Sequence, residues 1–339
     1  AVHDVAFCPA PRAHLLVTVA SDAAVRVWST KTLLQAAVLE GHSGSVNAVA
    51  FAPGGEEFVT ASDDHSAIIW GKPAGADGAA ALSPSDTASD APVFVRRATL
   101  RAHSDKVFSA VWFADGSRIA TASAHVVIVW DVETRSEIGR VAAPHDEVDA
   151  SAAEGSREPR HEALHAQRRT SSAPHVVDTF VGLSVSASGA FIATVSHRAI
   201  RIWSAESFTE VEAMRSRTRA NFMSVHFSPS LAAARLVAGM SDGSAVVYET
   251  LRYSKLCTLS GHHSAVEHAH FSADGVYIAT ASDDGIAAIW PHLPSVGVLH
   301  GSKTWNVTPE SELFFTHGFE DNSHTALGLE LQRSGVDRH

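Results

Sequence analysis

The sequence predicts an all-β chain folded as a β-propeller, with seven four-stranded antiparallel blades, or six as the alternative count. The first observation is the segment 261–290, in which two turns containing Asp and Gly separate three strand-like runs. This pattern is typical of an antiparallel meander. The second observation is a copy of the segment, with the same landmarks, at 41–70. The third is a recurrence of about 42 residues, in the range of propeller blades.

Aromatic residues that close each copy locate the blades along the chain. Their intervals are 42, 60, 73, 45 and 42 residues, and they are Trp28, Trp70, Trp130, Trp203, Tyr248 and Trp290. Three strands alone bury too little surface to be stable, so the copies must share one core. The whole chain, 1–339, is therefore predicted to be a single propeller domain.

Apolar alternation and turn residues place the strands, with the innermost strand first in each blade. The expected strands are 2–7, 15–19, 25–28 and 33–39 in the first blade; 46–51, 57–61, 67–70 and 93–100 in the second; 107–113, 118–121, 126–130 and 137–141 in the third; 180–185, 191–195 and 199–203 in the fourth; 222–227, 235–239 and 245–248 in the fifth; 266–271, 276–281, a run ending at 290, and 296–299 in the sixth. A degenerate last blade is expected at about 300–331, with strands at 304–308, 312–316 and 326–331.

Two intervals exceed the period, which indicates insertions at about 71–92 and 144–174. The first insertion consists largely of Ala, Ser, Pro and Asp with one leucine, and the second mixes acidic with basic residues. Segments with so little apolar surface cannot offset the entropy lost on ordering. We therefore expect both insertions to be flexible loops.

Composition limits the function classes that fit this chain. Its formal net charge is −11, which argues against direct binding to nucleic-acid backbones or anionic membranes. Its two cysteines give no disulfide framework and predict an intracellular, reducing compartment, the cytoplasm being favoured over the nucleus. No apolar run reaches the roughly 18 residues of a transmembrane helix, so no membrane span is expected.

Specific residues recur at matching places in the second and sixth copies, and they are Gly41-His42, Asp64 and Trp70, then Gly261-His262, Asp284 and Trp290. At these residues the sequence resembles the WD-repeat (WD40) family of β-propellers, and the resemblance covers nearly the whole chain. The Trp-Asp pair of the family survives only as Trp130-Asp131. The resemblance implies a rigid circular platform for protein partners, without a particular reaction and without a cofactor.

The same two copies contain a set of groups that can form a continuous hydrogen-bond network. In each, a Thr precedes the Trp by ten residues and an Asp precedes it by six, and the sets are His42, Thr60, Asp64 and Trp70, then His262, Thr280, Asp284 and Trp290. Such a His, hydroxyl and carboxylate could form a catalytic relay. Because the set is repeated, we interpret it as a structural network that can be satisfied while buried. The third and fourth copies are one residue shorter here and lack the Asp.

Candidate partner-binding residues occupy the second position of each expected inner strand, on the face where the Gly-His pairs lie. The resemblance implies that these positions ring the mouth of the channel and touch partners. They are His3, Asn47, Phe108, Val181, Met223, Glu267 and Trp305. Aromatic and Met side chains are enriched at interface centres, which favours Phe108, Met223 and Trp305. Packing between the blades is the alternative for these three.

A second ring is expected from the turns between the second and third strands, at Ser21, Asp63, His125, His197, Arg198, Ser241 and Asp283. This ring is acidic in blades two and six and basic or His-bearing in blades three and four. From both rings we select nine partner-binding residues, Phe108, Met223, Trp305, Asn47, Glu267, Asp63, Asp283, His197 and Arg198.

The 21 histidines raise the question of a metal site. Alternation places His268 and His270 on one side of a strand, close in sequence to His262-His263. No cysteine pair or carboxylate completes a zinc ligand set there, so no metal is predicted.

Together these features predict a non-enzymatic scaffold for protein–protein interaction, a subunit of a multiprotein assembly that docks partners on the Gly-His face. The alternative within this class is a substrate or peptide receptor of a ubiquitin ligase or a chromatin complex. The alternative from another class is an enzyme, for which no catalytic motif is visible. The expected partners are other proteins, without direct contact to nucleic acid.

The domain organisation predicts a distinctive pattern of limited proteolysis. Protease should cut within about 71–92 and 144–174, because these insertions are expected to be exposed, and the fragments should remain associated as one particle. Mass spectrometry of the fragments and size-exclusion chromatography under native conditions check this result. Cleavage mainly inside the blades would contradict the single-domain organisation.

Overall fold

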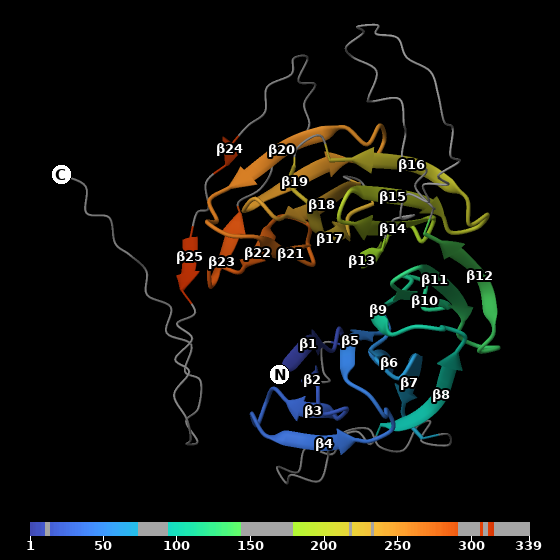
Figure 1. Cartoon of the computed structure of the whole chain (residues 1–339). Coiled ribbons are helices and arrows are strands. Elements are labelled where there is room, and N and C mark those ends of the chain that lie inside the picture. The colour runs from blue at the N-terminus through green and yellow to red at the C-terminus, as the bar shows by residue number, and fades with distance from the viewer. Residues whose placement is uncertain are drawn as a thin grey trace, which may run out of the picture.

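The structure is a computed structural model that describes residues 1–10, 14–73, 94–143, 179–216, 219–231 and 234–290, with the backbone of 306–307 and 311–314. In this part of the chain, six sheets are arranged around a central axis as the blades of a propeller (Figure 1). Each blade has four antiparallel strands, ordered from the axis outward. The fold is therefore the expected all-β propeller.

The first three blades follow the chain without crossovers. They are β1 (Val2–Phe7), β2 (Leu15–Ala20), β3 (Val25–Ser29) and β4 (Gln35–Leu39); β5 (Val46–Phe51), β6 (Glu57–Ser62), β7 (Ser66–Gly71) and β8 (Val95–Arg101); and β9 (Val107–Trp112), β10 (Arg118–Ser123), β11 (Val126–Asp131) and β12 (Glu137–Ala142).

The last three blades continue this order. They are β13 (Phe180–Val185), β14 (Phe191–Ser196), β15 (Ala199–Ser204) and β16 (Glu210–Arg215); β17 (Phe222–Phe227), β18 (Arg235–Met240), β19 (Ser244–Glu249) and β20 (Lys255–Ser260); and β21 (Val266–Phe271), β22 (Ile278–Ser282), β23 (Ile286–Trp290) and β25 (Ser311–Phe314). A short strand, β24 (Asn306–Val307), pairs in parallel with β20.

The prediction of the sixth outer strand and of the first strands of a seventh blade was wrong. The outer strand of blade six is β25, which overlaps the segment 312–316 that was assigned to the seventh blade, and it pairs with β23. The segment 304–308 contains β24, which joins the edge of blade five. The sequence of a short strand does not indicate which sheet edge it pairs with. Any free edge can accept it, because a free edge offers unpaired N–H and C=O groups. The described residues thus contain six blades. The segments 296–299 and 326–331 lie outside the described residues, as do most of the first insertion and all of the second.

Each joint between consecutive blades has its own buried apolar cluster, and there are five such clusters for six described blades. At the first joint Val17 and Val27 of blade one pack against Phe58, Ile68 and Trp70 of blade two. Because side chains alternate along a strand, the residues on either side of Val17 and Val27 point to the opposite face. Each blade therefore covers the preceding one with the face that carries its closing aromatic residue.

The inner strands of neighbouring blades are also tied by polar contacts. A carboxylate oxygen of Asp4 accepts a hydrogen bond from the Val49 amide at 2.9 Å. The indole of Trp112 donates to the carbonyl of Ala50 at 3.1 Å, again between adjacent blades. Burial raises the pKa of Asp4, while the Val49 amide acts in the opposite direction. These contacts hold the inner strands in a fixed arrangement.

Blades one and six form the two ends of the described arc (Figure 1). Among the described residues, no buried cluster joins them. Val5 and Phe7 of β1 are 51% and 70% exposed, and Trp28 is half-buried although its counterpart Trp70 is only 2% exposed. The aromatic-bearing face of blade one is thus open in the described part of the chain.

A glycine at the joint of blades five and six gives a test of this packing. A Cβ at Gly239 would lie 2.4 Å from the carbonyl oxygen of Val266, on the next blade. We expect Gly239→Ala to force the blades apart and to reduce the free energy of unfolding by about 1–3 kcal/mol. Chemical denaturation checks this value. A Cβ at Gly54 meets nothing within 4 Å, so Gly54→Ala is the matched control, and equal losses in both variants would contradict the packing.

Candidate functional site

Every inner strand contains a β-bulge at its second residue. In blade two, for example, Val46 pairs with Ser62 and Ala48 with Ala61, so that the residue between Val46 and Ala48 has no partner in the ladder. The six bulge residues are His3, Asn47, Phe108, Val181, Met223 and Glu267. We call this set the bulge ring. A bulge leaves one residue unpaired, re-aims its side chain and shifts the pairing register by one residue, and bulges are common beside functional sites.

The bulge ring lies on the Gly-His face, beside the turns between the second and third strands. The turn amide of Asp63 donates to the carbonyl of Ser45, just before β5, at 2.9 Å. The amide of Asp283 donates to the carbonyl of Ala265, just before β21, at 3.0 Å. These bonds place the turns and the bulge ring at one end of the propeller.

No residue of the bulge ring is fully buried. His3 is exposed and the other members are half-buried. Phe108 also packs against the cluster between blades three and four, and Val181 against the cluster between blades four and five. Phe108 therefore packs against this joint while part of its ring stays accessible, and its role in partner binding stays a prediction. Trp305 lies outside the described residues.

Two of the predicted partner-binding residues form a bridge between blades two and three. The side-chain amide of Asn47 donates to Asp63 at 2.8 Å and to the carbonyl of Val107 at 3.0 Å. The other carboxylate oxygen of Asp63 accepts from the ammonium of Lys106 at 2.7 Å. The hydrogen bonds from Asn47 and Lys106 lower the pKa of Asp63. Asp63 is therefore ionised at neutral pH, and Lys106 offsets part of its charge.

The remaining predicted residues are distributed around the face rather than gathered at one point. His197 and Arg198 are exposed in the turn of blade four, and Asp283 is exposed in the turn of blade six. Glu267 is half-buried in the bulge of blade six. Blades three to five thus present Phe108 and other apolar bulge residues beside basic groups, whereas blade six presents carboxylates.

The predicted network in blade two is a continuous series of hydrogen bonds. The indole of Trp70 donates to the Thr60 hydroxyl at 2.8 Å, and this hydroxyl lies 2.8 Å from Nε2 of His42. Nδ1 of His42 lies 2.8 Å from Asp64. Since the indole is only a donor, the geometry fits a Thr hydroxyl that donates to Nε2 and an Nδ1–H that donates to the carboxylate. The side chains of His42 and Asp64 are only 0% and 6% exposed, so the network is buried within the blade.

Blade six repeats this arrangement. The Trp290 indole donates to Thr280 at 2.8 Å, and the Thr280 hydroxyl lies 2.7 Å from Nε2 of His262. Nδ1 of His262 lies 3.1 Å from Asp284, which also accepts from two backbone amides. Burial acts to raise the pKa of Asp284, but these hydrogen bonds outweigh burial and lower it. For Asp64 the same balance lowers the pKa to about 2.

Blades three and four contain shorter versions of the network. His103 lies 2.7 Å from the Thr121 hydroxyl, which accepts from Trp130 at 2.8 Å. The Nδ1 atom of His103 is buried and has no partner among the described residues. Burial lowers the pKa of His103 to about 4, so its ring is neutral near pH 7. In blade four only the Trp203 to Thr194 bond, at 2.8 Å, represents this series.

Two features of the site were missed at the sequence level. Blade one also has a Thr ten residues before its Trp, and Trp28 donates to Thr18 at 2.9 Å; the spacing alone could have revealed it. The bulges carry no residue signature, because their six residues differ in size and charge.

The histidines of the central strands lie close together without forming a metal site. The rings of His226 and His270 have centroids 4.0 Å apart, and those of His268 and His270 are 6.2 Å apart. Burial lowers the pKa of His226. Within the described ranges, no group of three His, Cys, Asp or Glu residues is arranged to hold a metal ion.

The model of a known protein family matches three parts of this sequence. The model of the family described as "WD domain, G-beta repeat" (WD40) matches residues 34–71, 94–131 and 253–291. Each match begins in or just before the outer strand of one blade and ends with the third strand of the next. The chain therefore carries WD40 repeats on a β-propeller, and the resemblance inferred from Gly-His, Asp and Trp is confirmed.

Several curated proteins are similar to parts of the chain. The serine-threonine kinase receptor-associated protein of Gallus gallus is 24% identical over 62% of this chain and 49% of its own length. WD repeat-containing protein 37 of Mus musculus is 30% identical over 39% and 32%, and transducin beta-like protein 3 of Mus musculus is 38% identical over 20% and 9%. The matches span about half or less of the length of these relatives.

In the part of the chain that the structure describes, no helix has the length and apolar character needed to span a membrane.

The blade-six network leads to a prediction on stability. Asp284→Ala leaves the buried Nδ1–H of His262 and two amides without their acceptor, and should lower the free energy of unfolding by about 1–3 kcal/mol. Urea denaturation followed by circular dichroism measures the change. Asp283→Ala alters the exposed neighbour and should change it by about 0.5 kcal/mol or less. Equal shifts of the two midpoints would exclude the network as a stabilising element.

Proposed function

We propose that this protein is a non-enzymatic interaction scaffold, a subunit of a multiprotein assembly that docks partner proteins on the Gly-His face. The observation that carries the proposal is the bulge ring. Its six positions are equivalent in the fold, accessible in every blade and different in residue type. Because a bulge residue does not pair in the ladder, its side chain can vary without disturbing the register. Such positions are suited to partner recognition.

A non-catalytic function is supported by the burial of the groups that resemble a relay. His262 and Asp284 are 2% and 8% exposed, and their hydrogen-bonding capacity is used within the blade. A second set with the same geometry lies in blade two. A reactive group must reach its substrate, and these groups cannot. Their role is to fix the strands that present the bulge ring.

The distribution of groups favours a docking region over blades three to five. Phe108, Val181 and Met223 supply apolar surface there, and Arg198 lies exposed in the turn of blade four. Aromatic, Met and Arg side chains are enriched in protein interfaces. This combination fits a partner segment with apolar anchors and nearby carboxylates. The partners proposed are proteins rather than nucleic acids, in accord with the net charge of −11, and the proposed compartment is the cytoplasm.

The docking region predicts the effect of truncating its aromatic residue. Phe108→Ala should reduce the affinity for the partner by about 1–2 kcal/mol or more, because an interface anchor is lost. The measurement is quantitative mass spectrometry of proteins recovered with the purified chain, followed by calorimetry with the recovered partner. Thermal unfolding is recorded in parallel.

Two controls make the result specific. Leu251→Ala removes a side chain that is 90% exposed in the loop between β19 and β20, and should leave recovery unchanged. Phe113→Ala removes a fully buried ring and should lower stability by about 3–5 kcal/mol. If Phe108→Ala behaves like Phe113→Ala in stability, or like Leu251→Ala in binding, the docking region is elsewhere.

A further inference from the structure

Basic side chains gather on the Gly-His face where blade four meets blade five. His197 and Arg198 are exposed in the turn between β14 and β15, and Arg219 is exposed in the connection from β16 to β17. We call these three residues the basic surface. Within the described ranges, neither arginine has a hydrogen-bond or ion-pair partner for its guanidinium. The proposed docking region therefore contains two cationic groups that no described residue neutralises.

Backbone hydrogen bonds hold the two arginines on adjoining loops. The amides of Ser216 and Phe222 donate to the two carbonyls of the turn that carries Arg198, at 3.1 Å each. The Ser216 hydroxyl donates to the carbonyl of Ala220 at 2.9 Å, which closes the connection into a loop. Arg219 belongs to this loop, and both ends of the loop are bonded to the turn. The two guanidinium groups are thus presented from neighbouring, fixed stretches of backbone.

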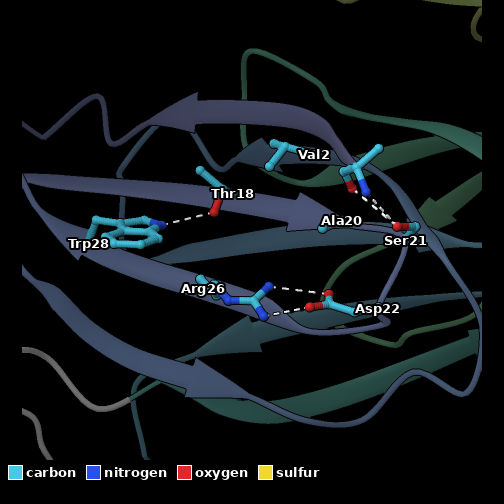
Figure 2. Close-up of a pocket in the computed structure, with 8 residues that line it drawn as sticks. Val2, Thr18, Ala20, Ser21, Asp22, Arg26 and Trp28 are labelled. Atoms are coloured by element: carbon cyan, nitrogen blue, oxygen red, sulfur yellow. Dashed lines mark hydrogen bonds and ion pairs between the residues drawn. The ribbon is translucent and has the colours of Figure 1, made fainter. Parts of the chain in front are cut away.

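Cations on the same face of other blades are paired with carboxylates. In blade one Arg26 binds both carboxylate oxygens of Asp22, at 2.5 and 3.2 Å (Figure 2). Lys106 binds Asp63 at 2.7 Å. In blades three to five, the turns between second and third strands contain a single carboxylate, Asp242, which accepts hydrogen bonds from its own turn at 3.1 and 2.6 Å. The two guanidiniums of the basic surface therefore remain available to a ligand.

The chemistry of two adjoining guanidiniums favours a phosphate monoester as their ligand. Each guanidinium presents its N–H donors in a planar fork that matches phosphate or carboxylate oxygens. A phosphorylated side chain carries a charge of about −1.5 to −2 at pH 7 and three acceptor oxygens, so it can engage both groups, whereas one carboxylate carries a single charge. The half-buried Met223 directly follows Phe222 and offers apolar contact to a neighbouring residue of a peptide.

The net charge of −11 disfavours a polyanion such as nucleic acid or an anionic membrane as the source of the phosphate, because repulsion acts over the whole molecule. A single phosphate on a protein segment avoids most of this repulsion. We propose that the basic surface binds a phosphorylated side chain of the partner segment. This inference rests on the proposed docking function of the same face.

The first experiment compares two immobilised libraries of random peptides, one with a central phosphoserine and one with serine at the same position. The phosphoserine library should retain the purified chain about tenfold more, since a hydrogen bond between charged groups corresponds to at least this factor. Arg198→Gln and Arg219→Gln should each reduce the retention about tenfold. Arg252→Gln removes the same charge from the exposed loop between β19 and β20, at the opposite end of the propeller, and should leave retention unchanged. Equal retention on both libraries, or an equal loss in Arg252→Gln, would overturn the proposal.

Thermal unfolding of each variant is recorded, and the Tm should not change, because both arginines are exposed. Arg198→Lys keeps the charge without the planar fork and should retain part of the preference for phosphoserine. Vesicles of phosphatidylserine and phosphatidylcholine are tested in parallel. Binding to these vesicles that needs Arg198 and Arg219, without a preference for the phosphoserine library, would assign the surface to a membrane and refute the proposal.

A second experiment separates this inference from the proposed function on which it rests. A partner recovered with the chain is treated with phosphatase, and its affinity for the chain should fall about tenfold or more. An affinity that is lost in Phe108→Ala but unchanged by phosphatase and by both arginine substitutions would refute the phosphate site and leave the docking region standing. Retention on the phosphoserine library that needs both arginines, with partner affinity unchanged in Phe108→Ala, would support the phosphate site and reject Phe108 as an anchor.

Discussion

A tryptophan buried between two blades needs an acceptor for its indole N–H, and the fold depends on how that need is met. In five of the six described blades a threonine hydroxyl on the adjacent strand accepts this hydrogen, at 2.8–2.9 Å. The indole can then cover the preceding blade with its apolar surface, without leaving a polar atom unsatisfied in the joint. The histidine and the carboxylate extend this contact in blades two and six towards the Gly-His face.

The same arrangement separates the residues that hold the blades from the residues that face outward. The hydrogen-bonded groups lie inside the blade, and their identities recur because each must match a donor to an acceptor. The bulge residues lie at the end of the inner strand and have no such requirement. Asn47 shows that the separation is not complete, since it also bridges two blades through Asp63 and the Val107 carbonyl.

Much of this organisation could be predicted from the sequence, because the strands alternate and their turns contain Asp and Gly. The predicted strands of the first five blades agree with the structure to within two residues. The spacing of Thr60, Asp64 and Trp70 also indicated hydrogen-bonding partners. The same spacing of Thr18, Asp22 and Trp28 in blade one was overlooked, although it could have been recognised in the sequence. The bulges and the outer strand of blade six could not be predicted, since pairing with a sheet edge depends on which edge is free and not on local composition.

The offset between sequence repeat and structural blade has a consequence for how such a chain can be shortened. Each match to the family comprises the outer strand of one blade and three strands of the next. A chain cut at a repeat boundary therefore does not lose a whole blade; it keeps three strands and strips the outermost one. The result is an unprotected strand edge, which is a template for aggregation. A cut between blades leaves complete sheets but exposes the apolar face of a joint. Neither kind of truncation removes a self-sufficient unit. Neighbouring blades are therefore expected to fold and unfold together, rather than one blade at a time.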